Sequence, residues 1–111
     1  FGVVAELAGE ALAGEATRLA GLRDALEAGL LALAPDTAIF GRAASRLPNT
    51  SAFSTPGVAA ETMLIKLDLA GIALSSGSAC SSGKVRRSHV LAAMGVDPAM
   101  SEGALRTSLG W

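Results

Sequence analysis

Leucines recur at helical spacing through the first third of the chain, and this pattern restricts the possible folds more than any other. Successive leucines are separated by seven, three, four, four and three residues, at positions 12, 19, 22, 26, 30 and 33. Such spacings place the side chains on one face of an α-helix. We therefore expect a helix from about Val3 to Leu33, ended by Pro35. Its charged residues fall mainly off the leucine stripe and are expected to form a solvated face: Arg18, Arg23, Asp24 and Glu27.

The middle of the chain changes to short strand patterns around a second helix. Residues 37–41 and 50–55 are predicted strands, and the turn-like residues 46–49 lie between them. Apolar residues at positions 60, 63, 64 and 67 predict a helix, with Gly71 as its C-terminal cap. Residues 72–74 then form a short apolar segment that we predict as a strand.

The last third predicts two short helices and a strand. Ser88 is a suitable cap for a helix that ends at Gly95, and Asp97-Pro98 is typical of a helix start. Residues 103–110 alternate, so that positions 105, 107 and 109 share one face and Arg106 shares the other with Ser108. If the leucines face the core, Arg106 points away from it.

This order of elements predicts an α+β fold. A long N-terminal connecting helix, residues 1–34, precedes a small and largely antiparallel sheet with helices on one face, residues 35–111. The chain begins at Phe1 and its first methionine is Met63, so we expect it to be a piece of a longer protein.

Composition excludes several kinds of function. The chain has 111 residues, of which 50% are hydrophobic and 17% charged, and this balance suits one folded domain. Nine basic and ten acidic residues give a net charge of -1 without a basic block, which argues against nucleic-acid or membrane-surface binding. We find neither an apolar run long enough to span a membrane nor a signal peptide. A single cysteine cannot form an internal disulfide, so a reducing, cytoplasmic setting is expected.

That cysteine, Cys80, lies in a Ser/Gly-rich loop that we assign to residues 75–84. Small neighbours leave the sulfur unshielded, and the glycines give the backbone freedom. A thiolate is a strong nucleophile, and the nearby cations Lys84, Arg86 and Arg87 could lower its pKa. Two interpretations stay open on these residues alone: a reactive thiol, or an incidental cysteine in a linker.

Few other residues are suited to chemistry. Arg106 offers a bidentate fork for a carboxylate, although the pattern alone favours a plain surface arginine. Asn49 lies in a Pro-Asn turn and His89 at a helix start, where structural roles account for both. One Cys and one His are too few soft ligands for a metal site.

Taken together, these segments resemble the C-terminal part of the cysteine desulfurases, which are class V aminotransferases. The matching stretches occur in the family's order: FGVVAELA at 1–8, RLPNT at 46–50, LDLAGIALSSGSACSSG at 67–83, SHVLAAMG at 88–95 and LRTSLG at 105–110. The resemblance covers essentially the whole chain. Its centre is SSGSACSSG at 75–83, which is similar to the branch of the family with a long cysteine loop that serves iron–sulfur cluster assembly.

The resemblance implies a fold and a reaction. The fold is the C-terminal domain of the fold-type I aminotransferases. L-Cysteine would react with pyridoxal phosphate, and the Cys80 thiolate would attack the substrate sulfur, which leaves a persulfide on Cys80 and releases L-alanine. Arg106 would bind the substrate carboxylate, with Asn49 as a further candidate for substrate binding. A sulfur-acceptor or iron–sulfur scaffold protein would receive the sulfur, and the full-length protein would be a homodimer.

The resemblance also limits what this chain does alone. The family's cofactor lysine and cofactor-binding residues belong to a larger preceding domain, and neither Lys66 nor Lys84 has the context of that lysine. We expect no cofactor site in these residues and no turnover by them alone. Two alternatives stay open: a non-enzymatic persulfide carrier or partner-docking module, and a related lyase acting on selenocysteine or another amino acid.

Overall fold

The computed structural model describes residues 1–76 and 88–110. The elements in this part follow the expected order: α1 (Gly2–Leu33), β1 (Ala38–Ile39), β2 (Thr50–Ser54), α2 (Ala60–Leu69), β3 (Ser75–Ser76), α3 (His89–Ala93), α4 (Pro98–Glu102) and β4 (Leu105–Ser108). The described strands form one antiparallel sheet in the order β1-β2-β4-β3. The predicted α+β class, with a long first helix and a small antiparallel sheet, is confirmed.

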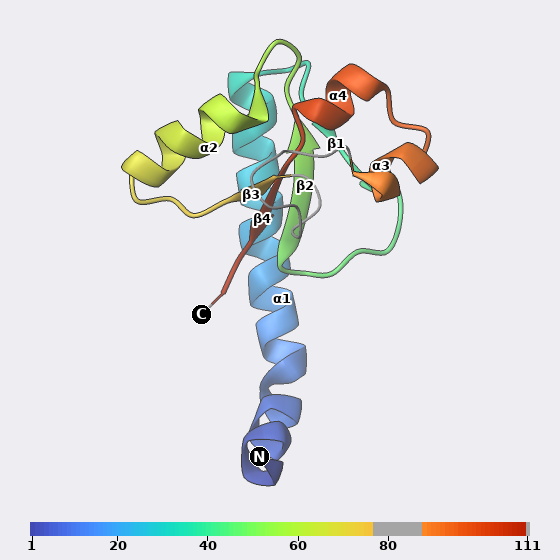
Figure 1. The fold of residues 1–111 in the computed structure, drawn as a ribbon. Coiled ribbons are helices and arrows are strands. Elements are labelled where there is room, and N and C mark those ends of the chain that lie inside the picture. Colours follow the sequence, from blue (N-terminus) through green and yellow to red (C-terminus); the bar gives the residue numbers. More distant parts are fainter. Residues whose placement is uncertain (77–87, 111) are drawn as a thin grey trace.

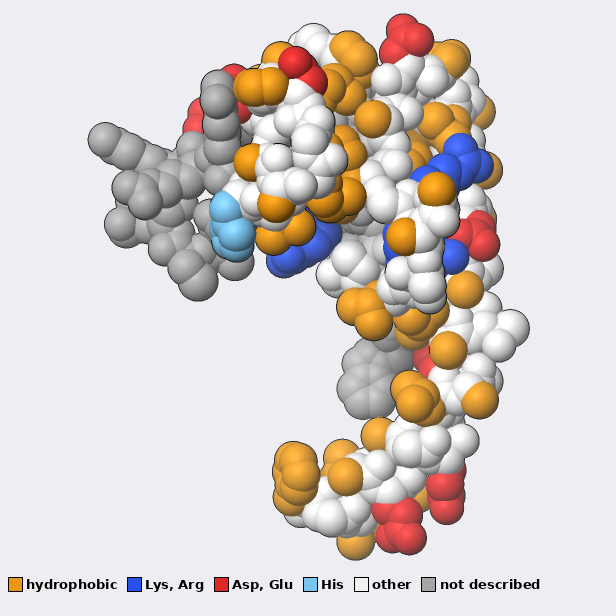
Figure 2. Space-filling model, turned by 90° about the vertical axis from the view of Figure 1, so that its right-hand side faces the viewer, with side chains coloured by type: hydrophobic (Ala, Val, Ile, Leu, Met, Phe, Trp, Pro, Cys, Tyr) orange, Lys and Arg blue, Asp and Glu red, His pale blue; other side chains and the backbone are white. Residues whose placement is uncertain are grey.

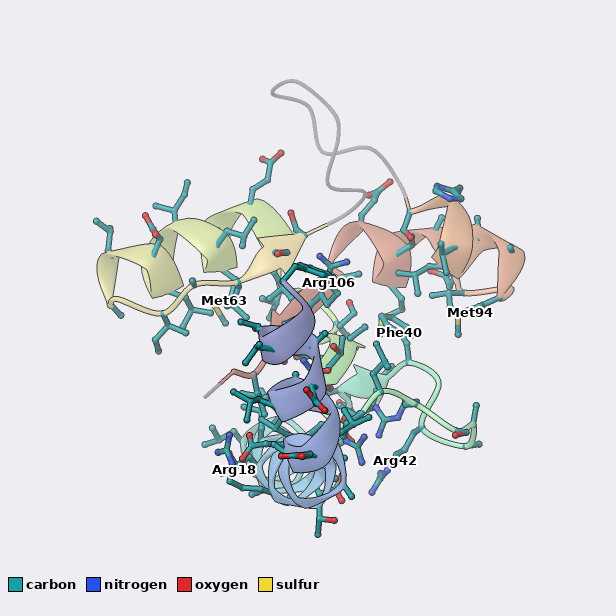
Figure 3. All side chains as sticks on the ribbon, turned by 90° about the horizontal axis from the view of Figure 1, so that it is seen from below. Arg18, Phe40, Arg42, Met63, Met94 and Arg106 are labelled. Atoms are coloured by element: carbon teal, nitrogen blue, oxygen red, sulfur yellow. The ribbon has the colours of Figure 1, made fainter. Side chains whose placement is uncertain are left out.

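The long helix α1 runs behind the sheet, and the shorter helices flank it (Figure 1). In the view from below, α2 lies on one side of the strands and α3 and α4 lie together on the other (Figure 3). The helix α1 thus covers one face of the sheet, and the shorter helices lie at its two sides.

The core lies between the sheet, α1 and α2. Phe53 of β2 and Leu105 of β4 are register partners, so their side chains share one face of the sheet, and both are buried. Ala60, at the start of α2, completes this cluster. Leu30 of α1 and Met63 of α2 are among the partly buried side chains packed against it. This core therefore fixes the last turns of α1 and the inner face of α2 against the sheet.

The N-terminal half of α1 extends beyond this core. All of the first 14 residues are exposed, including the apolar side chains Val3, Val4, Leu7 and Leu12. Figure 2 shows hydrophobic side chains along this projecting part. The predicted helix is confirmed, but its leucine stripe contacts the sheet only towards its C-terminal end, because the strands do not extend along its first turns. None of the helices in the described ranges is long and apolar enough to cross a membrane.

The predicted helix ends are confirmed. The side chain of Ser88 accepts a hydrogen bond from Leu91 N, and that of Asp97 accepts one from Ala99 N, with Pro98 in the first turn. Gly71 and Gly95 follow the C-caps of α2 and α3 with φ of 78° and 74°, values that glycine adopts without strain.

The prediction of a strand at residues 72–74 is wrong. The amide of Ile72 donates to Leu67 O at 2.8 Å, so the chain is still closing the end of α2 at that point. The strand β3 begins at Ser75, where the backbone first pairs with Arg106. The apolar residues lie directly before the strand, but the pairing with β4 determines where the strand begins.

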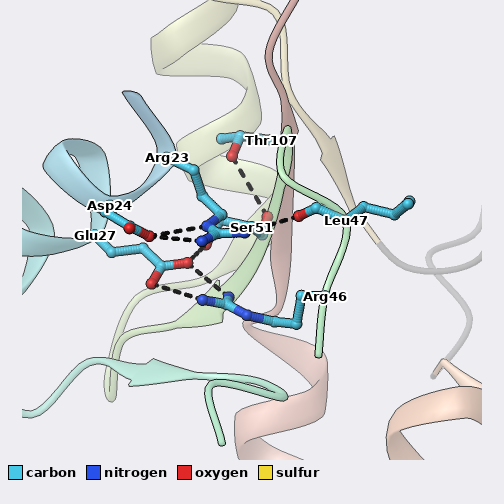
Figure 4. Close-up of polar contacts among 7 residues, drawn as sticks. All are labelled: Arg23, Asp24, Glu27, Arg46, Leu47, Ser51 and Thr107. Carbon is cyan, nitrogen blue, oxygen red and sulfur yellow. Dashed lines mark hydrogen bonds and ion pairs between the residues drawn. The ribbon is translucent and has the colours of Figure 1, made fainter. Parts of the chain in front are cut away.

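A buried ion pair joins α1 to the segment that leads into β2 (Figure 4). Glu27 is only 4% exposed and accepts two hydrogen bonds from the guanidinium of Arg46, at 2.7 and 3.1 Å. Ser51 Oγ donates to the same carboxylate at 2.7 Å. Next to it, Arg23 donates to the carbonyl oxygen of Leu47 at 2.9 Å.

The expectation that these four charged residues of α1, namely Arg18, Arg23, Asp24 and Glu27, are solvated is therefore wrong for two of them. Glu27 is buried and the Arg23 side chain is 13% exposed, whereas Asp24 and Arg18 remain exposed. A carboxylate can be buried here because its charge is paired and its oxygens are hydrogen-bonded. The bonds from Arg46, and then that from Ser51, lower the pKa of Glu27, although burial opposes the shift.

A close approach of backbones fixes the entry to β4. Gly103 lies just before the strand, where an added Cβ would come within 2.8 Å of Ser54 Oγ and 2.9 Å of the carbonyl oxygen of Val58. A backbone carbonyl cannot rotate away as a side chain can, so only glycine fits without displacement.

Gly103→Ala is accordingly expected to destabilise the protein that contains this chain by about 1–3 kcal/mol, the usual cost of overpacking. Gly21→Ala is the matched control, because nothing lies within 4 Å of its Cβ position and the residue is in the middle of α1. In this control the free energy of unfolding should rise by up to about 1 kcal/mol, because alanine is more favourable than glycine inside a helix. Urea denaturation monitored by circular dichroism measures both, and equal effects of the two variants would contradict the packing argument.

Glu27→Gln is expected to lower the free energy of unfolding by about 3 kcal/mol near neutral pH. The substitution leaves the charge of Arg46 without its partner at a largely buried position. The folded pKa of Glu27 lies below its ordinary value of 4.5. Its contribution is therefore full above that value and is lost as the pH falls through the folded pKa, since the unfolded chain takes up the proton first. The stability difference between wild type and variant should shrink in acid, as measured by urea midpoints at several pH values.

The control for this prediction is Glu15→Gln, which removes the carboxylate of the exposed Glu15–Arg18 pair. Solvent screens that pair, so no measurable loss is expected. A difference between wild type and Glu27→Gln that stayed constant from neutral to acid pH would show that the ionised carboxylate is not what stabilises the fold.

Candidate functional site

Arg106 is carried by β4, which lies between β2 and β3 in the sheet. The preceding residue, Leu105, is 4% exposed and points into the core, whereas Arg106 is exposed. Successive side chains of a strand point to opposite faces. The prediction that Arg106 faces away from the core is confirmed.

Small side chains lie opposite Arg106 on both neighbouring strands. Its register partners are Ala52 on β2 and Ser75 on β3, and directly opposed residues of antiparallel strands share a face. Figure 3 shows Arg106 next to β3. In the described part of the chain, the guanidinium has no hydrogen-bond or ion-pair partner. A charged fork with small neighbours and no competing carboxylate is suited to binding a carboxylate from outside.

Asn49 has a different position. Its Nδ2 donates to the carbonyl oxygen of Leu109 at 3.2 Å, and its carbonyl oxygen accepts the amide of Leu109 at 2.8 Å. Its Oδ1 accepts from the Thr50 hydroxyl at 3.2 Å. These bonds extend the pairing of β2 and β4 by one residue, three positions beyond Arg106. They support the structural interpretation of Asn49, and its role in substrate binding stays a prediction.

The turn-like residues 46–49 thus hold β2 in place from both sides. Arg46 bonds Glu27 of α1, Leu47 accepts a bond from Arg23, and Asn49 bonds Leu109 beyond β4. Because β2 pairs with β4 over four residues, this segment also fixes the strand that carries Arg106.

The remaining sequence candidates divide into two groups. His89 is exposed at the first position of α3, directly after the capping Ser88. This agrees with the interpretation of His89 as part of a helix cap. Cys80 lies outside the described residues, as do the cations that follow it, Lys84, Arg86 and Arg87.

The described residues do not fit pyridoxal phosphate. Such a cofactor needs a lysine in an enclosed site. The lysine within the described ranges, Lys66, lies on the exposed side of α2, in its last turn. Nor do these ranges contain a group of three or more His, Cys, Asp or Glu residues placed to hold a metal ion.

A pocket of about 650 Å³ lies at the opposite end of β4 from Leu109, between residues 55–61 and α4. Apolar groups line much of the pocket, and the carboxylates of Glu61 and Asp97 also line it. None of the described residues that line it is basic. An anionic substrate would be repelled there, so this pocket does not compete with Arg106 as a carboxylate site.

Two features of the site escaped the sequence analysis. The alternation of residues 103–110 placed Arg106 correctly, but it gave no indication that Ser75 would lie opposite. The buried Glu27 looked like an ordinary helix charge, and the only signal was an arginine in a segment otherwise suited to a turn, Arg46.

Comparison with known proteins agrees with the resemblance. Residues 7–111 match the family model described as aminotransferase class-V. Cysteine desulfurase NifS of Azotobacter vinelandii is 43% identical over 98% of this chain, and a cysteine desulfurase of Gluconacetobacter diazotrophicus is 45% identical over 97%. The chain spans 27% of each of these relatives.

Solved structures show the same fold. A NifS-like protein from Rickettsia africae superposes with a TM-score of 0.82 at 31% identity, covering 99% of this chain and 28% of that one. Another structure, described as a NifS-like protein, gives a TM-score of 0.77 at 35% identity, covering 94% of this chain and 25% of that one. With the family model matching nearly the whole sequence, the chain belongs to the class-V aminotransferase family.

Proposed function

We propose that the full-length protein containing this chain is a cysteine desulfurase. It would remove the sulfur of L-cysteine to give L-alanine and a persulfide on Cys80. The observation that carries this proposal is the 43–45% identity to cysteine desulfurases along almost the whole chain. The site is consistent with it, because the substrate has a carboxylate and Arg106 is exposed without a described partner.

The proposed roles follow from the chemistry of the side chains. The Cys80 thiolate is the nucleophile that takes the sulfur, since a thiolate forms an S–S bond with a sulfur that departs from carbon. Arg106 holds the substrate carboxylate through its fork of N–H donors. In the sequence Cys80 follows Ser75 by five residues, and Ser75 is the register partner of Arg106. The nucleophile and the carboxylate site therefore belong to adjoining parts of the chain.

The remaining parts of the activity lie outside the described residues. Pyridoxal phosphate, when bound, supplies an electron sink for bonds to the substrate's α-carbon. We propose that it is held by the part of the protein that the relatives have and this chain does not span. We further propose a sulfur-acceptor or iron–sulfur scaffold protein as partner, a homodimeric full-length protein, and a cytoplasmic location.

Cys80→Ser in the full-length protein should abolish persulfide formation and alanine release from L-cysteine, because serine cannot accept the sulfur as a stable persulfide. Mass spectrometry of the peptide containing residue 80 detects the added sulfur atom, and amino-acid analysis detects alanine. Ser82→Ala, in the same Ser/Gly-rich segment, is the control and should retain both.

Two results would change the proposal. Unchanged alanine release by Cys80→Ser would remove Cys80 from the reaction. If the wild-type protein takes sulfur from a persulfide donor onto Cys80 but releases no alanine from L-cysteine, a sulfur carrier describes the protein instead.

Arg106→Gln should raise the KM for L-cysteine about 10- to 100-fold, the equivalent of one lost charge-assisted contact of about 1.5–3 kcal/mol. Arg42→Gln removes another exposed arginine, between β1 and β2, and is the matched control that should leave KM unchanged. Steady-state kinetics of alanine formation separate the two variants. Equal KM values for wild type and Arg106→Gln would exclude Arg106 from substrate binding.

A further inference from the structure

We propose that Ser75 is a second carboxylate-binding residue, which acts beside Arg106 on the same face of the sheet. This inference rests on the proposed function, because it concerns the binding of the same substrate. It assigns a substrate-contacting role to the first residue of β3, which is also the first residue of the predicted cysteine loop.

The register of β3 and β4 places the two residues together. Ser75 is paired with Arg106, and Ser76 is paired with Leu105. Directly opposed residues in an antiparallel pair have Cβ atoms about 4.5–5.5 Å apart and point to the same side. Since Leu105 points into the core, Ser76 shares the core face, and Ser75 shares the exposed face with Arg106.

The hydroxyl of Ser75 is available for a ligand. Ser75 is exposed, and its side chain has no hydrogen-bond partner in the described structure. The hydroxyl of Ser51, on the core face of β2, is instead committed to Glu27. Ser108 is also exposed on the face of Arg106, but it lies two residues further along β4 and opposes Thr50. Ser75 is therefore the hydroxyl-bearing residue that is paired with Arg106.

The two groups complement each other chemically. A guanidinium has only donors, whereas a hydroxyl donates one hydrogen bond and accepts others. A carboxylate bound by Arg106 has lone pairs to spare, so the Ser75 hydroxyl can donate to one of its oxygens while accepting from a guanidinium N–H. This third contact fixes the orientation of the carboxylate, and it favours substrates that have one over thiols that do not.

The test compares Ser75→Val with Ser75→Thr in the full-length protein. Valine and threonine have the same shape and suit a strand, but only threonine keeps the hydroxyl. Ser75→Val should raise the KM for L-cysteine about 3- to 10-fold, with kcat little changed, and Ser75→Thr should restore it. Ser76→Ala, next along the strand but on the core face, and Ser108→Ala are the positional controls and should leave KM unchanged.

A binding measurement separates this inference from the proposed function. Calorimetric titration with 3-mercaptopropionate, which has a thiol and a carboxylate, should show weaker binding to Ser75→Val, whereas cysteamine, which lacks the carboxylate, should bind wild type and variant equally. If Ser75→Val and Ser75→Thr bind 3-mercaptopropionate alike, or if Ser108→Ala has the larger effect, the role of Ser75 is overturned. If the wild type binds 3-mercaptopropionate through Ser75 but does not act on L-cysteine, the proposed function fails and the carboxylate site stands.

Discussion

The bidentate pair of Glu27 and Arg46 is the interaction on which the rest of the structure depends. It joins the last turns of α1 to the segment before β2, and the bond from Ser51 extends it into β2 itself. Withdrawing two charges from water is costly, and attraction offsets that cost only when the geometry is good and the remaining groups are bonded. Both conditions hold here. The ion pair fixes β2 against α1. Because β2 pairs with β4, it also helps to fix the position of Arg106.

The features that sequence predicted are those set by neighbours along the chain. Capping residues such as Ser88 and Asp97, and glycines such as Gly71, determine helix ends within a few residues, and each was placed correctly. Strict alternation placed Arg106 on the outer face of β4 for the same local reason. Nothing about these features needs a distant part of the chain.

The features that sequence could not give depend on partners far away in the chain. Glu27 is buried because Arg46 reaches it from 19 residues later, and a helical pattern alone puts such a glutamate in solvent. The strand β3 begins at Ser75 rather than at the apolar residues before it, because backbone pairing with Arg106 decides where a strand exists. Prediction of the candidate site from the sequence is limited in the same way. Alternation predicts the face of the sheet on which Arg106 lies, but only the strand register shows which residues of β2 and β3 lie opposite it.

The two outer strands of the sheet, β1 and β3, have two residues each. A sheet edge offers unpaired amides and carbonyls to any other extended chain, and a long edge invites aggregation. Among the described residues, these short strands cover only Phe53 and Ser54 of β2 and Leu105 and Arg106 of β4, so only short stretches of the two inner strands are left for another extended chain to pair with. This part of the chain can therefore keep the face of its sheet that carries Arg106 exposed, with little backbone available for another polypeptide to add as a further strand.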